Sequence, residues 1–430
     1  MKGKKFGIII ALLAAAAFAL SACGNDGSTG ATGATGPAGP QGPPGQNGTN
    51  FSAQNAEFLS TTTYTGTITR VSITSPPVVE FRIVDGKGYG IDGLEKPVGT
   101  STSLNNLRFT IAKLVPGTSG SPDKWVSYII GATFEAKNHE KVAANLTPLG
   151  NGNYRYTFAQ DLATVPDVTY EPTLTHRLGI RFSGAIPDTT TQIKNSMVMT
   201  KDFVPAGGAV VTKHDVTTKA ACLECHGTFE GRSGGHLAYA DPKMCVLCHT
   251  DQWRKGQTES TITGTVITPP AGTTNTHIVR GEAILNFVPM IHKAHTGRNL
   301  KLTGYSYNSG RFLFNQMGYP QETANCRKCH EQSADVAQGD NWKNKPSRVA
   351  CGACHDNVNF SDASTHGGGA GGARDKDLVC PVWHTPDYIE LKHLTINATL
   401  NNPNVPAGAT NFTYEISSLT VNADNQPVVK

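Results

Sequence analysis

The stretch Cys222-Leu223-Glu224-Cys225-His226 decides the fold of this chain, because the same pattern recurs three more times, beginning at Cys245, Cys326 and Cys351. Two thiols three positions apart on a helical turn can each bond one vinyl group of a haem, and the adjacent imidazole can then ligate the iron. The pattern is the signature of c-type haem attachment. We therefore expect a segment of loops and short helices wrapped around cofactors.

A fifth copy of the pattern is altered. It reads Cys380-Pro381-Val382-Trp383-His384, with Trp383 at the place of the second cysteine. Cys380 could still form one thioether bond and His384 could still ligate iron; the alternative is that the indole crowds the porphyrin edge and no haem is held. We predict haem c at the four intact motifs and favour a fifth haem held by one thioether. The expected thioether-forming residues are Cys222, Cys225, Cys245, Cys248, Cys326, Cys329, Cys351, Cys354 and Cys380, and the expected proximal ligands are His226, His249, His330, His355 and His384.

Two other uses of these cysteines have to be weighed. The spacing of Cys222 and Cys225 from Cys245 and Cys248 is also that of a zinc ribbon, and an exported protein could pair its cysteines in disulfides. Neither alternative gives a role to the histidine that follows the second cysteine in every intact copy. Haem attachment accounts for both residue types, so we prefer it.

Each haem needs a second histidine from outside its motif if every iron has two protein ligands. His292 and His295, three residues apart on an expected helix, lie on one side of it and could serve two neighbouring haems. Two imidazoles on each iron leave no open position for a substrate, which favours electron transfer over catalysis at iron. The candidate distal ligands are His236, His292, His295, His366 and His393, with His214 in reserve, and His277 is also available.

The N-terminus is a targeting segment. Lys2, Lys4 and Lys5 precede an apolar run over residues 6–20 that is too short to span a bilayer, and Leu20-Ser21-Ala22-Cys23 resembles a bacterial lipobox. We expect residues 1–23 to be a lipoprotein signal peptide, with Cys23 lipidated and the protein anchored in the outer membrane. The alternative is an ordinary signal peptide in which the cysteine occurs by chance.

Glycine recurs at every third position from Gly27 to Gly48, with prolines between, which is the collagen pattern. We expect residues 24–50 to form a tether, either an extended polyproline-II spacer or a short trimerisation segment.

Residues 51–205 alternate apolar and polar side chains with the period of a β-strand, for example at 79–83, 107–111, 154–158 and 178–182. The expected fold is an antiparallel β-barrel or sandwich, followed over residues 206–395 by a pentahaem domain of loops and short helices with little regular structure. A β-like pattern resumes within 396–430, where we expect the start of a second, truncated β domain. His139 and His176 are expected to be surface or core residues of the first β domain.

Composition supports this division. Hydrophobic residues make up 38% of the chain and aromatics 7%, which is a lean core for 430 residues that covalently held porphyrins would supplement. The formal net charge is +4, and three of the basic residues lie in the signal peptide, so no electrostatic basis for binding nucleic acid is expected.

The order of these features resembles the outer-membrane decahaem c-type cytochromes of the OmcA/MtrC type. The stretches that carry the resemblance are residues 290–297, 338–343 and 351–360, and it extends over residues 51–430. It implies that His236, His292, His295, His366 and His393 complete bis-histidine iron sites. It further implies a surface-exposed protein that passes respiratory electrons to ferric minerals, soluble metals or electron shuttles. The partners that the resemblance implies are other multihaem cytochromes or a porin–cytochrome complex. The chain corresponds to the first β-domain-plus-pentahaem half of that family, and Trp383 departs from its pattern.

Two other functions are alternatives to electron transfer. A multihaem oxidoreductase, such as a nitrite or sulfite reductase, would need one haem with an open position. A mainly adhesive surface protein would use the glycine tract but not the cysteines and histidines. We therefore expect an electron-transfer protein rather than an enzyme, with terminal metal-reductase activity left open.

Overall fold

The computed structural model describes residues 49–50, 56–97, 100–131, 139–186, 189–227, 241–362, 365–366, 374, 376–395 and 415–429. The predicted signal peptide with Cys23, most of the tether and His236 lie outside the described residues. The description below concerns the unit Gln46–Lys430. Within the ranges just given, no helix is long and apolar enough to cross a membrane.

The first four-stranded antiparallel sheet has the order β2-β3-β8-β7. Side chains of β3 alternate between buried and half-buried along the strand, with Val79, Phe81 and Ile83 facing the core, as the period-two pattern of that stretch predicts. The strands are β2 (Tyr64–Ser72), β3 (Val78–Asp85), β7 (Leu146–Gly150) and β8 (Asn153–Thr157).

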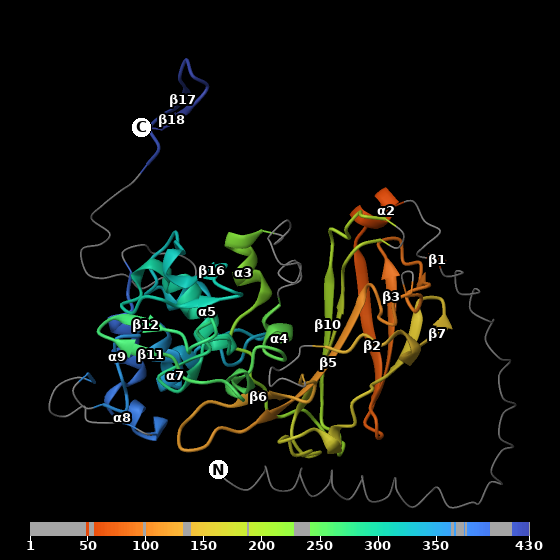
Figure 1. Ribbon diagram of the computed structural model, residues 1–430. Helices are drawn as coiled ribbons and strands as arrows, with labels where there is room; N and C mark the ends of the chain where they lie inside the picture. Colours follow the sequence, from red (N-terminus) through yellow and green to blue (C-terminus); the bar gives the residue numbers. More distant parts are fainter. Residues whose placement is uncertain are drawn as a thin grey trace, which may run out of the picture. The chain divides into compact units, whose positions relative to one another are not determined.

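The second antiparallel sheet has the order β10-β9-β5-β6 and packs against the first (Figure 1). Aromatic side chains fill the space between the sheets: the rings of Phe109 and Tyr156 stack with centroids 3.8 Å apart, and those of Tyr64 and Phe182 meet edge to face at 4.8 Å. This core fits the expected β-rich N-terminal part. The strands are β5 (Leu107–Val115), β6 (Lys124–Ser127), β9 (His176–Phe182) and β10 (Met197–Phe203).

Short elements complete this part of the chain. They are β1 (Thr49–Asn50), α2 (Ala56–Thr61), β4 (Ile91–Asp92), η2 (Ala143–Asn145) and η3 (Leu162–Thr164).

Downstream of β10 the described chain consists of short helices, two- or three-residue strands and connecting loops, as the sequence predicts. The longest described helix, α5, has only 10 residues. The helices are α3 (Lys219–His226), α4 (Pro242–Cys245), η5 (Asp251–Arg254), α5 (Phe287–Thr296), η6 (Gly297–Asn299), η7 (Phe314–Gln316), η8 (Cys326–Lys328), α6 (Asn341–Asn344), α7 (Arg348–Cys354), η9 (Asp377–Val379), α8 (Cys380–Trp383) and α9 (Pro386–Lys392). The hairpins are β11 (Thr261–Thr263) with β12 (Val266–Thr268), β13 (Ile278–Val279) with β14 (Glu282–Ala283), β15 (Ser306–Tyr307) with β16 (Phe312–Leu313), and β17 (Leu419–Val421) with β18 (Pro427–Val429).

The second sheet contacts the segment that carries the second motif. Leu114 and Trp125 share an apolar cluster with Met244 and Leu247. The buried guanidinium of Arg177 on β9 forms ion pairs at 2.6 Å with Asp202 and at 2.8 Å with Asp215, the second of which lies on the connection into the motif region. These contacts fix the second motif and the connection at Asp215 directly on the β-sheet.

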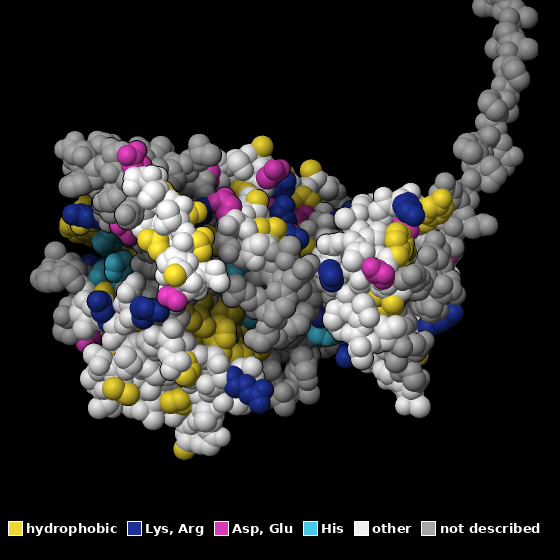
Figure 2. Space-filling view, turned by 90° about the horizontal axis from the view of Figure 1, so that it is seen from above, with side chains coloured by type: hydrophobic (Ala, Val, Ile, Leu, Met, Phe, Trp, Pro, Cys, Tyr) yellow, Lys and Arg dark blue, Asp and Glu magenta, His cyan; other side chains and the backbone are white. Residues whose placement is uncertain are grey.

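Charged side chains of both signs are interspersed on the face shown in Figure 2. This distribution agrees with the small net charge of the sequence.

Candidate haem sites

Each of the five motifs lies on a short helical turn, and in the first, second and fourth a side chain before the motif caps the start of that turn. Thr218 accepts a hydrogen bond from the backbone N–H of Ala221 at the start of α3, and Ser347 does the same for Ala350 at the start of α7. The helical turn brings the two cysteines and the histidine to neighbouring positions, which is the arrangement that haem attachment requires.

The same backbone hydrogen bond is found in the second, third, fourth and fifth motifs. The N–H of the motif histidine donates to the carbonyl of the first cysteine, at 2.9 Å from His249 to Cys245, 2.9 Å from His330 to Cys326, 2.8 Å from His355 to Cys351 and 2.8 Å from His384 to Cys380. The altered motif therefore folds into the same turn as the intact ones, although Trp383 replaces its second cysteine. The Trp383 side chain is 63% exposed.

Four motif histidines each face a second histidine from elsewhere in the chain. A metal–imidazole bond is about 2 Å long and the ring centre lies about 1 Å behind the nitrogen, so two imidazoles on opposite sides of one iron place their centres about 6 Å apart. The observed ring centroid separations are 6.0 Å for His226–His295, 6.0 Å for His292–His330, 6.2 Å for His355–His393 and 6.2 Å for His366–His384.

Hydrogen bonds to backbone carbonyls set the tautomer of five of the motif and candidate distal histidines. A carbonyl oxygen can only accept, so the Nδ1 atom must carry the proton, and Nε2 keeps the lone pair that a metal needs. The bonds are from His249 to Leu285 (3.0 Å), His292 to Val288 (2.9 Å), His295 to Ile291 (2.8 Å), His330 to Val216 (2.9 Å) and His393 to Ile389 (2.7 Å).

Burial also favours the neutral imidazole. It lowers the pKa of His292 to about 4, and it also lowers the pKa of His330, His355 and His384 below the ordinary value. These imidazoles are therefore neutral at pH 7, which is the form that binds a metal ion.

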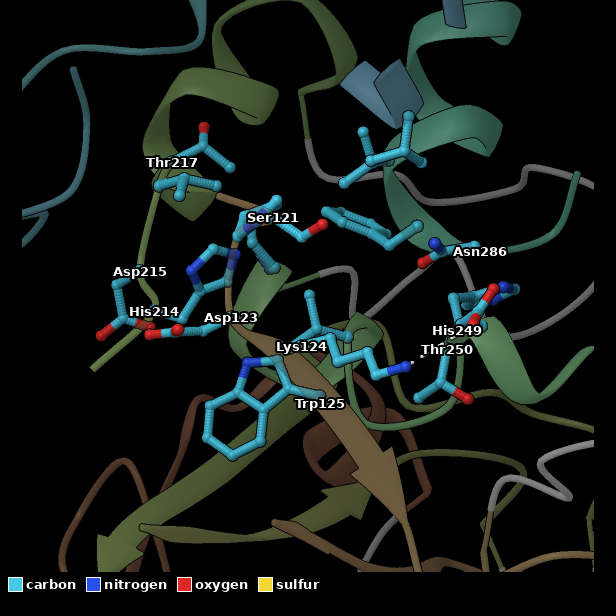
Figure 3. A pocket seen from close by; sticks show the side chains of 18 of the residues that line it. Ser121, Asp123, Lys124, Trp125, His214, Asp215, Thr217, His249, Thr250 and Asn286 are labelled. Carbon is cyan, nitrogen blue, oxygen red and sulfur yellow. Dashed lines mark ion pairs between the residues drawn. The ribbon is translucent and has the colours of Figure 1, made fainter. Parts of the chain in front are cut away.

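The second motif has a different environment. The His249 ring stacks on the indole of Trp253, with centroids 6.1 Å apart, and lines a cavity of about 240 Å³ together with His214 (Figure 3). Burial lowers the pKa of His214 as well. His277, the remaining histidine of this region, meets the Tyr307 ring edge to face at 6.3 Å. Among the described candidates, His214 is thus the one that shares a cavity with His249.

The surroundings of the motifs suit a large apolar group. Around the fifth motif, Leu378, Val382 and Leu391 are each more than 60% exposed. Exposed apolar side chains beside a Cys–His pair fit a site where a porphyrin ring would lie. None of the nine cysteines of the described region is in a disulfide, and no group of three or more His, Cys, Asp or Glu side chains within that region could hold a metal ion.

Of the two β-domain histidines predicted to be surface or core residues, His176 lies in the core. His176 is fully buried, its Nδ1 donates to the Leu174 carbonyl at 2.9 Å, and its Nε2 accepts from the Tyr128 hydroxyl at 2.9 Å.

Sequence reasoning missed a buried polar network beside the fourth motif, which comprises Lys293, Tyr305 and Asp356. The signal for it was present in α5, where Pro289, Lys293 and Thr296 are the buried positions at helical spacing. A lysine on the same face as two apolar or small residues is a candidate for burial, and this one lies between two candidate iron ligands.

Helical turns that present Cys-x-x-Cys-His opposite second histidines, several times in one segment, define the class of multihaem c-type cytochromes. Residues 214–393 match the family model described as outer membrane cytochrome MtrC/MtrF-like, domains II/IV. The chain is 24% identical over 295 residues to a multiheme cytochrome MtrC of Shewanella baltica (strain OS185), a match that covers 67% of this chain and 36% of that protein.

Two solved structures have a similar fold. The crystal structure of MtrC from Shewanella baltica OS185 matches with a TM-score of 0.50 and 22% identity, over 77% of this chain and 44% of that one. The crystal structure of the outer membrane decaheme cytochrome OmcA matches with a TM-score of 0.50 and 20% identity, over 72% and 45%. Over the part that these matches cover, the chain is similar to outer-membrane cytochromes of the MtrC/OmcA type. It spans less than half the length of the relatives it matches.

Proposed function

We propose that this chain holds haem c at its five motifs, the fifth through a single thioether bond, and that it conducts electrons along them. The observation that carries the proposal is the pairing of motif histidines with second histidines at the separation that one shared iron requires. Each bound haem would supply an iron that takes up and gives up one electron. The chain's own cysteines would attach the cofactors, and its histidines would ligate their irons.

The proposed axial pairs follow from these distances. They are His226 with His295, His330 with His292, His355 with His393, and His384 with His366, while His249 takes either His214 or His236. The proposed thioether bonds are those of Cys222, Cys225, Cys245, Cys248, Cys326, Cys329, Cys351, Cys354 and Cys380.

Two consequences favour conduction over catalysis. Two imidazoles on an iron leave it no position for a substrate, so electrons must pass between cofactors and partners without a bond to iron. In addition, α5 carries the partners of two different motif histidines: His292 faces His330, and His295 faces His226. One helix of 10 residues would therefore hold two haems close together, which suits rapid electron exchange between them.

We place the protein at the outer surface of the outer membrane. The lipobox ending in Cys23 would anchor it, and the glycine tract over residues 24–50 would hold the β domain (51–205) and pentahaem domain (206–395) away from the lipid or bring three chains together. Residues 396–430 would begin a second β domain. The proposed electron donors are other multihaem cytochromes or a porin–cytochrome complex, and the proposed acceptors are metal oxides, soluble metals or electron shuttles.

The intact mass of the purified, full-length protein tests haem attachment. A mass that includes five haems supports all five sites. A mass that includes four haems means that Cys380 holds no haem, and a mass without covalent haem refutes the proposal. Optical spectra of the oxidised protein separate conduction from the alternative, a reductase with one open haem. Six-coordinate spectra at every haem support conduction, whereas a five-coordinate component in the wild type favours the reductase.

Variants at the second motif identify its distal ligand. His214→Ala and His236→Ala can be compared directly, because both replace a candidate for the same iron. The variant that converts one haem to a five-coordinate state lacks the true ligand, and the other serves as its control.

A further inference from the structure

The buried ammonium group of Lys293 lies between two helices that carry haem-site residues. Lys293 is only 4% exposed, although it stands between His292 and His295 in α5. Helix α5 runs beside α7, which carries the fourth motif (Figure 1). A buried lysine is costly unless its charge is compensated by hydrogen bonds or ion pairs, so its contacts indicate what it does.

All three protons of the ammonium group have acceptors. Nζ lies 3.2 Å from the carbonyl oxygen of Gly352, 3.2 Å from that of Ala353 and 3.3 Å from the hydroxyl of Tyr305. Gly352 and Ala353 are the two residues between the cysteines of the fourth motif. Since an ammonium group has three donors, this site is complete for the charged form of lysine.

A buried carboxylate closes the same network. The Tyr305 hydroxyl donates at 3.2 Å to Asp356, whose carboxylate also accepts the backbone N–H groups of Lys301 and Leu302 at 2.9 Å each. Asp356 is 3% exposed and directly follows His355, the proximal histidine of the fourth motif. A positive and a negative group are therefore both buried beside one haem-attachment site.

A further contact joins α5 to the same motif. The Thr296 Oγ1 atom lies 2.8 Å from the carbonyl oxygen of His292 and 3.1 Å from the Sγ atom of Cys354. Together with Lys293, it fixes the helix bearing two candidate distal ligands against the attachment site of a third haem.

We infer that Lys293 and Asp356 are positioning residues that set the reduction potential of the haem attached at Cys351 and Cys354, in opposite directions. This inference rests on the proposed attachment of haem at that motif. Reduction adds one electron to the iron and leaves both imidazoles bound, so a nearby buried cation favours the reduced form and a buried anion opposes it. Lys293 also holds α5 against α7, so haems held by these helices would keep fixed separations.

The test is a redox titration of the full-length protein. The titration is monitored by a spectroscopic signal that resolves the individual haems. Lys293→Met, which keeps the length of the side chain and removes its charge, is expected to shift one haem to lower potential. Asp356→Asn, which keeps the shape and removes the opposite charge, is expected to shift the same haem to higher potential. Lys301→Met is the matched control, because Lys301 is exposed and contributes only its backbone N–H to the network.

Opposite shifts in one haem support the inference, because a loss of packing alone would not change sign with the charge removed. Unchanged potentials, or shifts in the same direction, overturn it. If Lys293→Met does not fold, Asp356→Asn still decides: a rise in potential supports the inference, and no change or a fall overturns it. The haem content of the wild type, measured by mass, keeps this result separate from the proposed function. A chain with no covalent haem refutes that function, whereas full haem content with unmoved potentials refutes only the role of these two residues.

Discussion

His176 makes the stability of the β domain depend on pH. Burial lowers its pKa from 6.5 to about 4, and the imidazole is held between the Leu174 carbonyl and the Tyr128 hydroxyl, both at 2.9 Å. The unfolded chain takes up a proton near the ordinary pKa, and the folded chain takes it up only near the lowered one. Between these two values the unfolded state binds more protons, so the free energy of unfolding falls as the pH falls through this window.

The size of the effect follows from the shift. One pKa unit corresponds to about 1.36 kcal/mol, so a shift from 6.5 to about 4 corresponds to a loss of about 3 kcal/mol on acidification. The loss begins near pH 6.5 and is complete near pH 4. In His176→Gln this part of the pH dependence disappears, because glutamine does not titrate.

Urea unfolding, monitored by far-ultraviolet circular dichroism at a series of pH values from 4 to 7, measures the free energy of unfolding of the wild type and of His176→Gln. We expect the wild type to be the more stable form at pH 7 and the two proteins to converge towards pH 4. Tyr128→Phe is the control, because it removes the hydroxyl partner of Nε2 and leaves the titrating ring in place. Its free energy of unfolding should still fall steeply as the pH falls from 6.5 to 4. Parallel curves for the wild type and His176→Gln would refute the reasoning.

Three further changes test other parts of the molecule. Arg177→Met removes the buried guanidinium that pairs with Asp202 and Asp215 and leaves the buried carboxylate of Asp215 only the longer contact with Lys243 at 3.6 Å, so we expect it to lower the free energy of unfolding by about 3–5 kcal/mol in urea titrations; a change under about 1 kcal/mol would contradict this. His295→Ala removes the imidazole that faces His226, so one haem should become five-coordinate in optical spectra while the haem count by mass stays the same; an unchanged spectrum would show that this pair does not share an iron. Trp383→Cys restores the second thiol of the fifth motif, so the haem count should stay constant while the alkaline pyridine spectrum moves towards that of fully thioether-bonded haem c; a rise in the haem count would mean that the wild type lacks the fifth haem.

The β-strands could be predicted because their signal is local. The alternating stretches at 79–83, 107–111 and 178–182 lie within β3, β5 and β9, where burial alternates or is nearly continuous. Alternation tells which face of a strand is buried, but not which strands are neighbours. The order β10-β9-β5-β6 therefore required the structure, since it pairs strands that are separated by many residues.

In the candidate site too, some residues could be predicted from the sequence and others could not. The cysteines and motif histidines could be read from spacing alone, because attachment to one haem needs all of them on a single turn. The sequence also supplied enough further histidines, but it did not say which one faces which motif. His295 faces His226 across a long stretch of chain, and only the folded structure brings the two rings to 6.0 Å. Lys293 was missed because a lysine flanked by histidines is ordinarily a surface residue, and its burial depends on the carbonyl groups of α7.

The central claim is that each motif histidine shares its iron with a second histidine. Low-temperature electron paramagnetic resonance of the oxidised, full-length protein, with the signals integrated against the protein concentration, tests it most directly. We expect only low-spin ferric signals, amounting to five irons for each chain, one for each motif histidine. A high-spin ferric signal in the wild type would contradict it, because at least one iron would then lack its second imidazole.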